Sequence, residues 1–258
     1  MNAFTRRYST ISPLPVPDVA PPFELPSGYV LLFRDRDWAG RKLDLSTHRF
    51  LPGVRHDLRR RSGSRRAAWV AFNLPRGHVM TLTRRHRELQ DCQPLSDLSN
   101  VGQVADLVGT GRTEAVDLAQ IDMCNTVASF FWRTVDLDKG AIELYSEPGF
   151  KGNRTMLFLS EWEKGALHSL ADWVIEDQLG SVRWTRLSGT QYCDLYQHSD
   201  GVGGRYPRLK VAPTGLNEAA DIAQRTVNDM VCSFRWGMDD VPSQDVLGRF
   251  SLEASFGC

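Results

Sequence analysis

Three stretches of the chain decide the fold: NTVASFFW (125–132), DQLGSVRW (177–184) and NDMVCSFRW (228–236). Each begins with Asn or Asp, continues to a serine, and ends on a tryptophan. The serines stand at positions 129, 181 and 233, a constant pitch of 52 residues. Such a pitch indicates a repeated supersecondary unit that buries its apolar face against a neighbouring copy. GSRRAAWVAF (63–72) is a fourth, divergent copy.

A second element precedes the copies: two aromatic residues with four residues between them, followed by a glycine. FRDRDWAG (33–40) and YSEPGFKG (145–152) carry it, while YQHSDGVGG (196–204) has Gly201 in place of the second aromatic. We expect the aromatic pair to clamp a folded hairpin, and the glycine to supply a backbone angle that a side chain would disfavour. The serine of each copy is expected to tie this hairpin by hydrogen bonds to its backbone.

Short runs rich in β-branched and aromatic residues, bounded by turn residues, predict that the chain is all-β. Helix is expected only as one or two turns within 160–173 and 217–229. Strand-like runs follow the hairpin glycines at GRKLDL (40–45), GNRTMLFL (152–159) and GRYPRL (204–209), and GRTEAVDL (111–118) is placed in the same position of the second repeat.

The repeats divide the chain into two β-sandwich domains, predicted over residues 28–136 and 137–240. The first is the more divergent and carries an insertion near 84–108. Residues 1–27 hold six of the 13 prolines, a density that favours extended backbone and disfavours helix. We therefore expect a proline-rich N-terminal arm that lies against its own domain or a partner. Residues 241–258 are expected to form a C-terminal tail.

The ordered recurrence of hairpin, Gly-Arg strand and Asn/Asp…Ser…Trp segment resembles the βγ-crystallin family. The resemblance covers about residues 28–237 and is strongest from Tyr145 to Trp236. It implies four Greek-key units in two β-sandwich domains of a microbial type. It also implies a non-enzymatic structural or interaction protein with a role in stress, dormancy or a coat.

In calcium-binding members of that family, the segment (Asn/Asp)-(Asn/Asp)-x-x-(Ser/Thr)-Ser gives oxygen ligands from its second and fifth side chains and from backbone carbonyls. The third unit has EDQLGS (176–181) at this position, and the fourth has NDMVCS (228–233). The resemblance therefore implies a weak calcium site in the C-terminal domain. Its ligands would be the carboxylates of Asp177 and Asp229 and the backbone carbonyls of Gln178 and Met230.

The fifth position of the segment has lost its hydroxyl in every copy, and the first copy has arginines at 65 and 66 where ligand oxygens belong. Two interpretations stay open: residual calcium binding in the C-terminal domain, or segments that serve only to fold the hairpin. The residues that replace the hydroxyl are Ala67, Ala128, Gly180 and Cys232.

The chain has 31 basic and 31 acidic residues, but the basic residues are unevenly distributed along it. Ten arginines and one acid lie from Arg55 to Arg87, a block that could attract an anionic partner or pair with the acidic remainder of the same chain. Stacking aromatics are not interleaved with it, so nucleic acid is not expected as a partner. No apolar run is long enough to predict a membrane span.

Five cysteines without a CxxC pair indicate reduced thiols. Together with an N-terminus that lacks an apolar run, they predict a cytoplasmic location, with leaderless export left open. The histidines have no metal-binding spacing, and no nucleophile elbow or phosphate-binding loop occurs, so no catalytic residue is predicted.

Two alternatives to a structural protein remain. One is a binding effector of the protease-inhibitor or killer-toxin-like type, which would use the arginine block and the inserted loop. The other is an enzyme grafted on the crystallin fold. A protein partner or a second copy of the chain is expected to meet the proline-rich arm.

Overall fold

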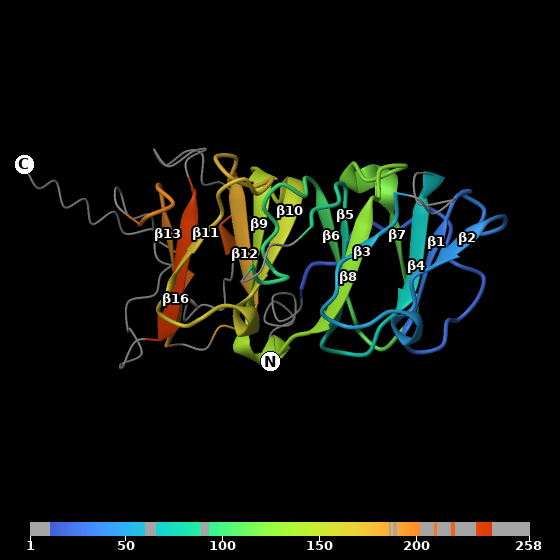
Figure 1. Ribbon diagram of the computed structural model, residues 1–258, viewed down its shortest axis with the longest axis horizontal. Coiled ribbons are helices and arrows are strands. Elements are labelled where there is room, and N and C mark those ends of the chain that lie inside the picture. Colours follow the sequence, from blue (N-terminus) through green and yellow to red (C-terminus); the bar gives the residue numbers. More distant parts are fainter. Residues whose placement is uncertain are drawn as a thin grey trace, which may run out of the picture. The chain divides into compact units, whose positions relative to one another are not determined.

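A computed structural model describes residues 11–59, 66–88, 93–185, 187, 190–201, 209–210, 218–219 and 231–238. The chain forms two compact units. We call them the N-terminal unit, built mainly on Ser12–Val135, and the C-terminal unit, built on Asp136–Gly152 and the described residues from Met156 onward. The described residues of both units form strands joined by loops and short 3₁₀ turns (Figure 1). No helix among them is long and apolar enough to cross a membrane.

The N-terminal unit contains two four-stranded sheets, ordered β2-β1-β4-β7 and β3-β8-β5-β6. Two 3₁₀ turns, Thr47–Arg49 and Leu118–Ile121, connect strands within it. The strands are β1 (Tyr29–Phe33), β2 (Lys42–Asp44), β3 (His56–Asp57), β4 (Trp69–Asn73), β5 (His78–Thr83), β6 (Val104–Val108), β7 (Glu114–Asp117) and β8 (Ser129–Thr134).

The C-terminal unit repeats this arrangement with sheets ordered β10-β9-β12-β15 and β11-β16-β13-β14. Its 3₁₀ turns are Leu137–Lys139 and Leu159–Glu161. The strands are β9 (Ala141–Glu147), β10 (Lys151–Phe158), β11 (Leu167–Ser169), β12 (Ser181–Thr185), β13 (Gln191–Tyr196), β14 (Leu209–Lys210), β15 (Glu218–Ala219) and β16 (Ser233–Met238).

The third strand of every group of four belongs to the opposite sheet. In the N-terminal unit β3 pairs with β8, and β7 pairs with β4. In the C-terminal unit β11 pairs with β16, and β15 pairs with β12. Each repeat therefore lends one strand to its neighbour, which is a Greek-key exchange, and neither repeat can close its apolar face alone. The all-β prediction and the pairing of repeats are confirmed.

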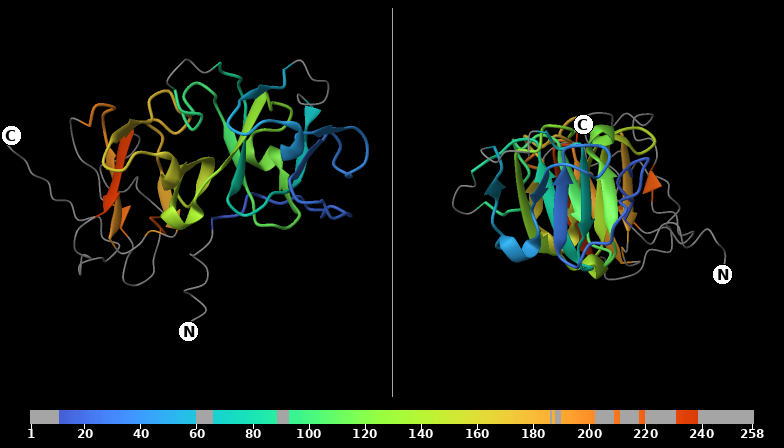
Figure 2. Two further views of the ribbon diagram at one scale, coloured as in Figure 1. Left: turned by 60° about the horizontal axis from the view of Figure 1, so that its bottom comes forward. Right: turned by 90° about the vertical axis from the view of Figure 1, so that its right-hand side faces the viewer.

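The arm residues 12–27 belong to the N-terminal unit (Figure 2). Leu25 packs into an apolar cluster with Phe33, Trp38 and Trp69 on the outer face of the sheet β2-β1-β4-β7. The indole nitrogen of Trp38 donates to the Val19 carbonyl at 2.9 Å. The neighbouring residues of β1 and β4 face the sandwich core, so both faces of this sheet are buried. This explains why the two central strands, β1 and β4, are nearly continuous apolar runs rather than alternating ones.

The second repeat differs from the sequence-based prediction in two ways. Residues 104–108, expected to belong to an insertion, form β6 and pair with β5, so the insertion ends before them. The stretch 111–118, expected to be the strand after a hairpin glycine, contains the third strand β7 instead. The inserted residues separate β5 from β6, and the hairpin pattern that marks the second strand elsewhere is therefore missing from the sequence.

The predicted helical turns also need correction. The stretch 160–173 contains the end of a 3₁₀ turn and then the strand β11. In 217–229 the described residues Glu218–Ala219 form β15, and the rest lies outside the described residues. Both stretches include a third strand of only two or three residues, which is too short to give a readable alternation of apolar and polar positions.

Candidate cation site

The aromatic hairpins have the geometry that the sequence predicts. The rings of Tyr145 and Phe150 are 5.8 Å apart and inclined at 72°, and those of Phe33 and Trp38 are 5.1 Å apart and inclined at 83°. The second aromatic of each pair has a left-handed backbone, and so does the glycine that follows, such as Gly152 at φ 73°. The clamp is therefore confirmed, since a chain reversal is held shut by edge-to-face ring contact.

The recurring serines tie these hairpins, as predicted. Ser181 Oγ accepts a hydrogen bond from the Phe150 amide at 2.9 Å and donates to the Glu147 carbonyl at 2.6 Å. Ser233 Oγ donates to the His198 carbonyl at 2.6 Å, in the fourth hairpin. These bonds join the end of a repeat to the hairpin at its start, so the third and fourth repeats are each closed by a side-chain hydrogen bond.

The Asn or Asp at the second position of the second and third segments has a backbone reason to be there. Asp177 has φ 51° and Asn125 has φ 62°, both in the left-handed region. Asn and Asp enter that region more readily than other side chains with a Cβ atom. The residue type at this position is therefore explained without any metal ion.

In both units, the segment of one repeat contacts the segment of the other repeat. Asp177, at the second position of the third segment, accepts a hydrogen bond from the thiol of Cys232, at the fifth position of the fourth, with Sγ and Oδ1 3.1 Å apart. In the N-terminal unit the Asn125 amide donates to the carbonyl of Ala67, which holds the corresponding fifth position, at 2.9 Å. A candidate site thus combines the second position of one segment with the fifth position of its neighbour.

Glu176 joins the pair in the C-terminal unit. One ligand atom each from Glu176, Asp177 and Cys232 lies within 4.8 Å of the others. The Asp172 amide donates to Glu176 Oε2 at 2.6 Å and so orients that carboxylate. Burial, reinforced by the two carboxylates, raises the pKa of Cys232 to about 12, so the thiol is protonated at neutral pH.

The predicted calcium ligands are only partly placed. Asp177 lies in the cluster, and Gln178 is exposed beside it with its amide bonded to the Ile175 carbonyl at 3.2 Å. Asp229 and Met230 lie outside the described residues. Glu176 and Cys232 were not predicted as ligands from the sequence. Glu176 is at the first position of its segment, which gives no side-chain ligand in the family pattern, and a thiol at the fifth position counts there as a lost hydroxyl.

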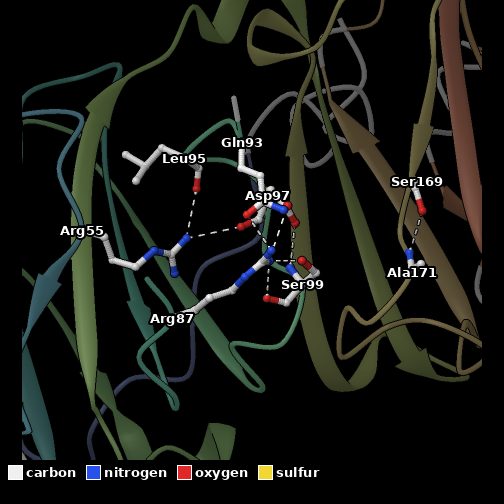
Figure 3. Close-up of polar contacts among 8 residues, drawn as sticks. All are labelled: Arg55, Arg87, Gln93, Leu95, Asp97, Ser99, Ser169 and Ala171. Carbon is white, nitrogen blue, oxygen red and sulfur yellow. Dashed lines mark hydrogen bonds and ion pairs between the residues drawn. The ribbon is translucent and has the colours of Figure 1, made fainter. Parts of the chain in front are cut away.

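The arginine block makes many of its contacts within the N-terminal unit. Arg87 Nη1 forms an ion pair with Asp97 at 3.4 Å and donates to Ser99, while Arg55 donates to the carbonyls of Leu95 and Asp97 at 3.3 Å (Figure 3). These two side chains hold the inserted loop against the unit. Burial lowers the pKa of Arg55 to about 10, with Arg87 and Arg133 adding repulsion and Asp97 opposing it.

A pocket of about 320 Å³ lies between the arm and the first hairpin. Its lining is mostly apolar and aromatic, and Glu24 and Lys42 bring the only charged side chains in it. The residues that line it are Phe23, Glu24, Leu25, Leu31, Phe33, Trp38, Gly40 and Lys42.

Comparison with known proteins finds similarity only at the level of structure. No protein-family model matches the chain, and no curated protein matches it. A betagamma-crystallin domain from Flavobacterium johnsoniae is 22% identical, with a TM-score of 0.28 and coverage of 39% of this chain and 97% of that one. A betagamma-crystallin domain of the Abundant Perithecial Protein from Neurospora crassa, in its Ca²⁺-bound form, is 18% identical, with a TM-score of 0.29 and coverage of 41% and 97%.

The N-terminal domain of protein S is similar at 20% identity, with a TM-score of 0.28 and coverage of 40% of this chain and 99% of that one. These matches each span about one domain of the present chain. Within the chain itself, the exchanged third strands, the clamped hairpins and the tied serines recur in order. The chain therefore has an all-β, βγ-crystallin-like fold built from Greek-key units.

Proposed function

We propose that this chain is a non-enzymatic structural or interaction protein of the βγ-crystallin type, with weak calcium binding in its C-terminal unit. The observation that carries the proposal is the contact between two segments, in which the Asp177 carboxylate meets residue 232 at 3.1 Å. Side chains from separate repeats thereby converge on one exposed point, which a cation could bridge.

Calcium binding is expected to be weak because the donor set is incomplete. Ca²⁺ takes six to eight oxygen ligands, and a thiol stands where the segment pattern has a hydroxyl. Asp177, Glu176 and a backbone carbonyl at Gln178 supply part of the shell, with Asp229 and Met230 as further proposed ligands. We expect a dissociation constant of about 10⁻⁴–10⁻³ M, the range of extracellular calcium modules.

Calorimetric titration of the chelator-stripped full chain with Ca²⁺, with the melting temperature recorded in parallel, tests this proposal. Binding to the native chain alone should give heat and raise the melting temperature at millimolar Ca²⁺. Asp177→Asn combined with Asp229→Asn should abolish both signals, since both substitutions remove the charge and Asn tolerates the left-handed backbone of position 177.

Asp172→Asn is the matched control, because Asp172 lies in the same loop and also has a left-handed backbone, at φ 64°. It should leave the heat and the melting shift unchanged. Absence of both signals in the unsubstituted chain would mean that the segments are folding elements only.

A second candidate function is binding of a partner through the inserted loop. Arg55 and Arg87 hold this loop in place, so a partner would meet a preformed surface at low entropic cost. The net positive charge of the Arg55–Arg87 block favours an anionic partner.

A further inference from the structure

Three potential metal-ligand atoms, one of them a sulfur, lie close together in the C-terminal unit. Those of Glu176, Asp177 and Cys232 all lie within 4.8 Å of one another. Around tetrahedral Zn²⁺, ligand atoms about 2.0–2.3 Å from the metal are about 3.3–3.8 Å apart. The 3.1 Å between Cys232 Sγ and Asp177 Oδ1 is close to that spacing already.

The backbone around these residues is held from several sides. The Cys232 amide donates to the Tyr196 carbonyl at 3.0 Å, and its own carbonyl accepts from the Leu170 amide at 2.7 Å. The Asp172 amide orients the Glu176 carboxylate from outside the trio, at 2.6 Å. Partners of this kind position metal ligands before the ion arrives.

The chemistry of the donors decides which ion fits. Hard Ca²⁺ selects oxygen, whereas thiolate selects Zn²⁺ and similar soft divalent ions. In the N-terminal counterpart Asn125 faces Ala67, so neither the carboxylate of position 177 nor the thiol of position 232 has an equivalent there, and Cys124 stands where Glu176 stands in the C-terminal unit. Only the C-terminal pairing described by the structure therefore joins carboxylates to a sulfur.

We propose that Glu176, Asp177 and Cys232 form a site for a Zn²⁺-class divalent cation, bound more tightly than Ca²⁺. This inference rests on the proposed function, since it deepens the assignment of the same site. The metal replaces the proton of the Cys232 thiol, a metal–sulfur bond forms, and the released proton passes to solvent. A water molecule would complete four-coordination.

The test is a Cd²⁺ titration of the chelator-stripped, reduced full chain, followed by the ultraviolet charge-transfer band of the cadmium–thiolate bond. Zn²⁺ affinity is then measured by competition with a chromophoric chelator. We expect one equivalent of Cd²⁺ to give the band and Zn²⁺ to displace it. Asp177→Asn and Glu176→Gln should each weaken Zn²⁺ binding by about tenfold or more, while keeping the thiol.

Cys232→Ser is the decisive variant, because it restores the hydroxyl of the segment pattern. It should lose the band, weaken Zn²⁺ binding by more than about tenfold and strengthen Ca²⁺ binding. Cys124→Ser, at a half-buried thiol of the N-terminal unit, is the matched control and should leave the band and the Zn²⁺ affinity unchanged.

Unchanged Zn²⁺ affinity in Cys232→Ser and in both carboxylate variants would overturn the inference, even if Ca²⁺ binds as proposed. Failure of Ca²⁺ to bind either the unsubstituted chain or Cys232→Ser, with thiol-dependent Cd²⁺ binding intact, would remove calcium from the proposed function and leave the inference standing. If Cys232→Ser fails to fold by circular dichroism, the two carboxylate variants decide the question.

Discussion

Gly180→Ser is expected to lower the free energy of unfolding of the C-terminal unit by about 3 kcal/mol. A Cβ atom at position 180 would lie 2.5 Å from the backbone carbonyl carbon of Glu147 and 2.7 Å from the Pro148 nitrogen. The hairpin cannot move aside, because the Gly180 amide donates to the Tyr145 carbonyl at 2.8 Å and Ser181 ties the Glu147 carbonyl. Urea denaturation of the full chain, followed by circular dichroism, measures the loss.

Gly149→Ser provides the matched control in the same hairpin. A Cβ atom there would meet nothing within 4 Å, and only the left-handed backbone, at φ 71°, opposes a side chain. Its cost should be about 1 kcal/mol. A loss at position 180 no greater than this would contradict the close packing of the segment on its hairpin.

The same packing bears on calcium. Position 180 is the fifth of the third segment, where the family pattern carries a ligand hydroxyl. Restoring that hydroxyl at 180 costs stability, whereas restoring it at 232 places an oxygen beside Asp177 without such a clash being expected. The hydroxyl at position 180 is therefore excluded by close packing, whereas no such packing excludes one at position 232.

Leu25→Ala is expected to lower the free energy of unfolding of the N-terminal unit by about 3 kcal/mol. Leu25 is only 9% exposed and packs in the cluster that contains Trp38 and Trp69. Its backbone is fixed on both sides, since its amide donates to Thr113 Oγ1 at 2.8 Å and its carbonyl accepts from Asn73 at 2.7 Å. The backbone therefore cannot collapse into the cavity that the substitution leaves.

Val16→Ala is the control for this prediction, because Val16 belongs to the same arm but is 63% exposed. Its effect should stay within about 0.5 kcal/mol. A loss for Leu25→Ala as small as that for Val16→Ala, measured by urea denaturation with tryptophan fluorescence, would contradict the packing of Leu25 in this cluster.

Local features of the fold could be predicted from the sequence. The clamp of Tyr145 on Phe150 and the tie from Ser181 join residues of a single repeat, and each needs a recognisable residue type at a fixed spacing. Left-handed positions such as those of Gly152 and Asp177 carry the glycine, Asn or Asp that such a backbone favours, whereas the left-handed backbone of Phe150 is not indicated by its residue type. Residue types and their spacing are therefore enough to predict the hairpins, the tying serines and the strand-rich character.

Contacts between different repeats cannot be predicted from residue types and their spacing in this way. Cys232 meets Asp177 across 55 residues, and nothing in either segment indicates which other segment it faces. The prolines of the arm indicate extended backbone but not the sheet face on which the arm lies. The position of β6 could not be predicted, because an insertion removes the pattern that marks its counterparts.

The most direct test of the candidate cation site is hydrogen–deuterium exchange of the full chain with and without saturating Zn²⁺ and, separately, Ca²⁺. We expect slower amide exchange in peptides that span 172–181 and 231–233, with no change around Asn125 and Ala67, because only the C-terminal pairing carries ligands. Protection centred on the N-terminal pairing, or no protection with either ion, would contradict the assignment of this site.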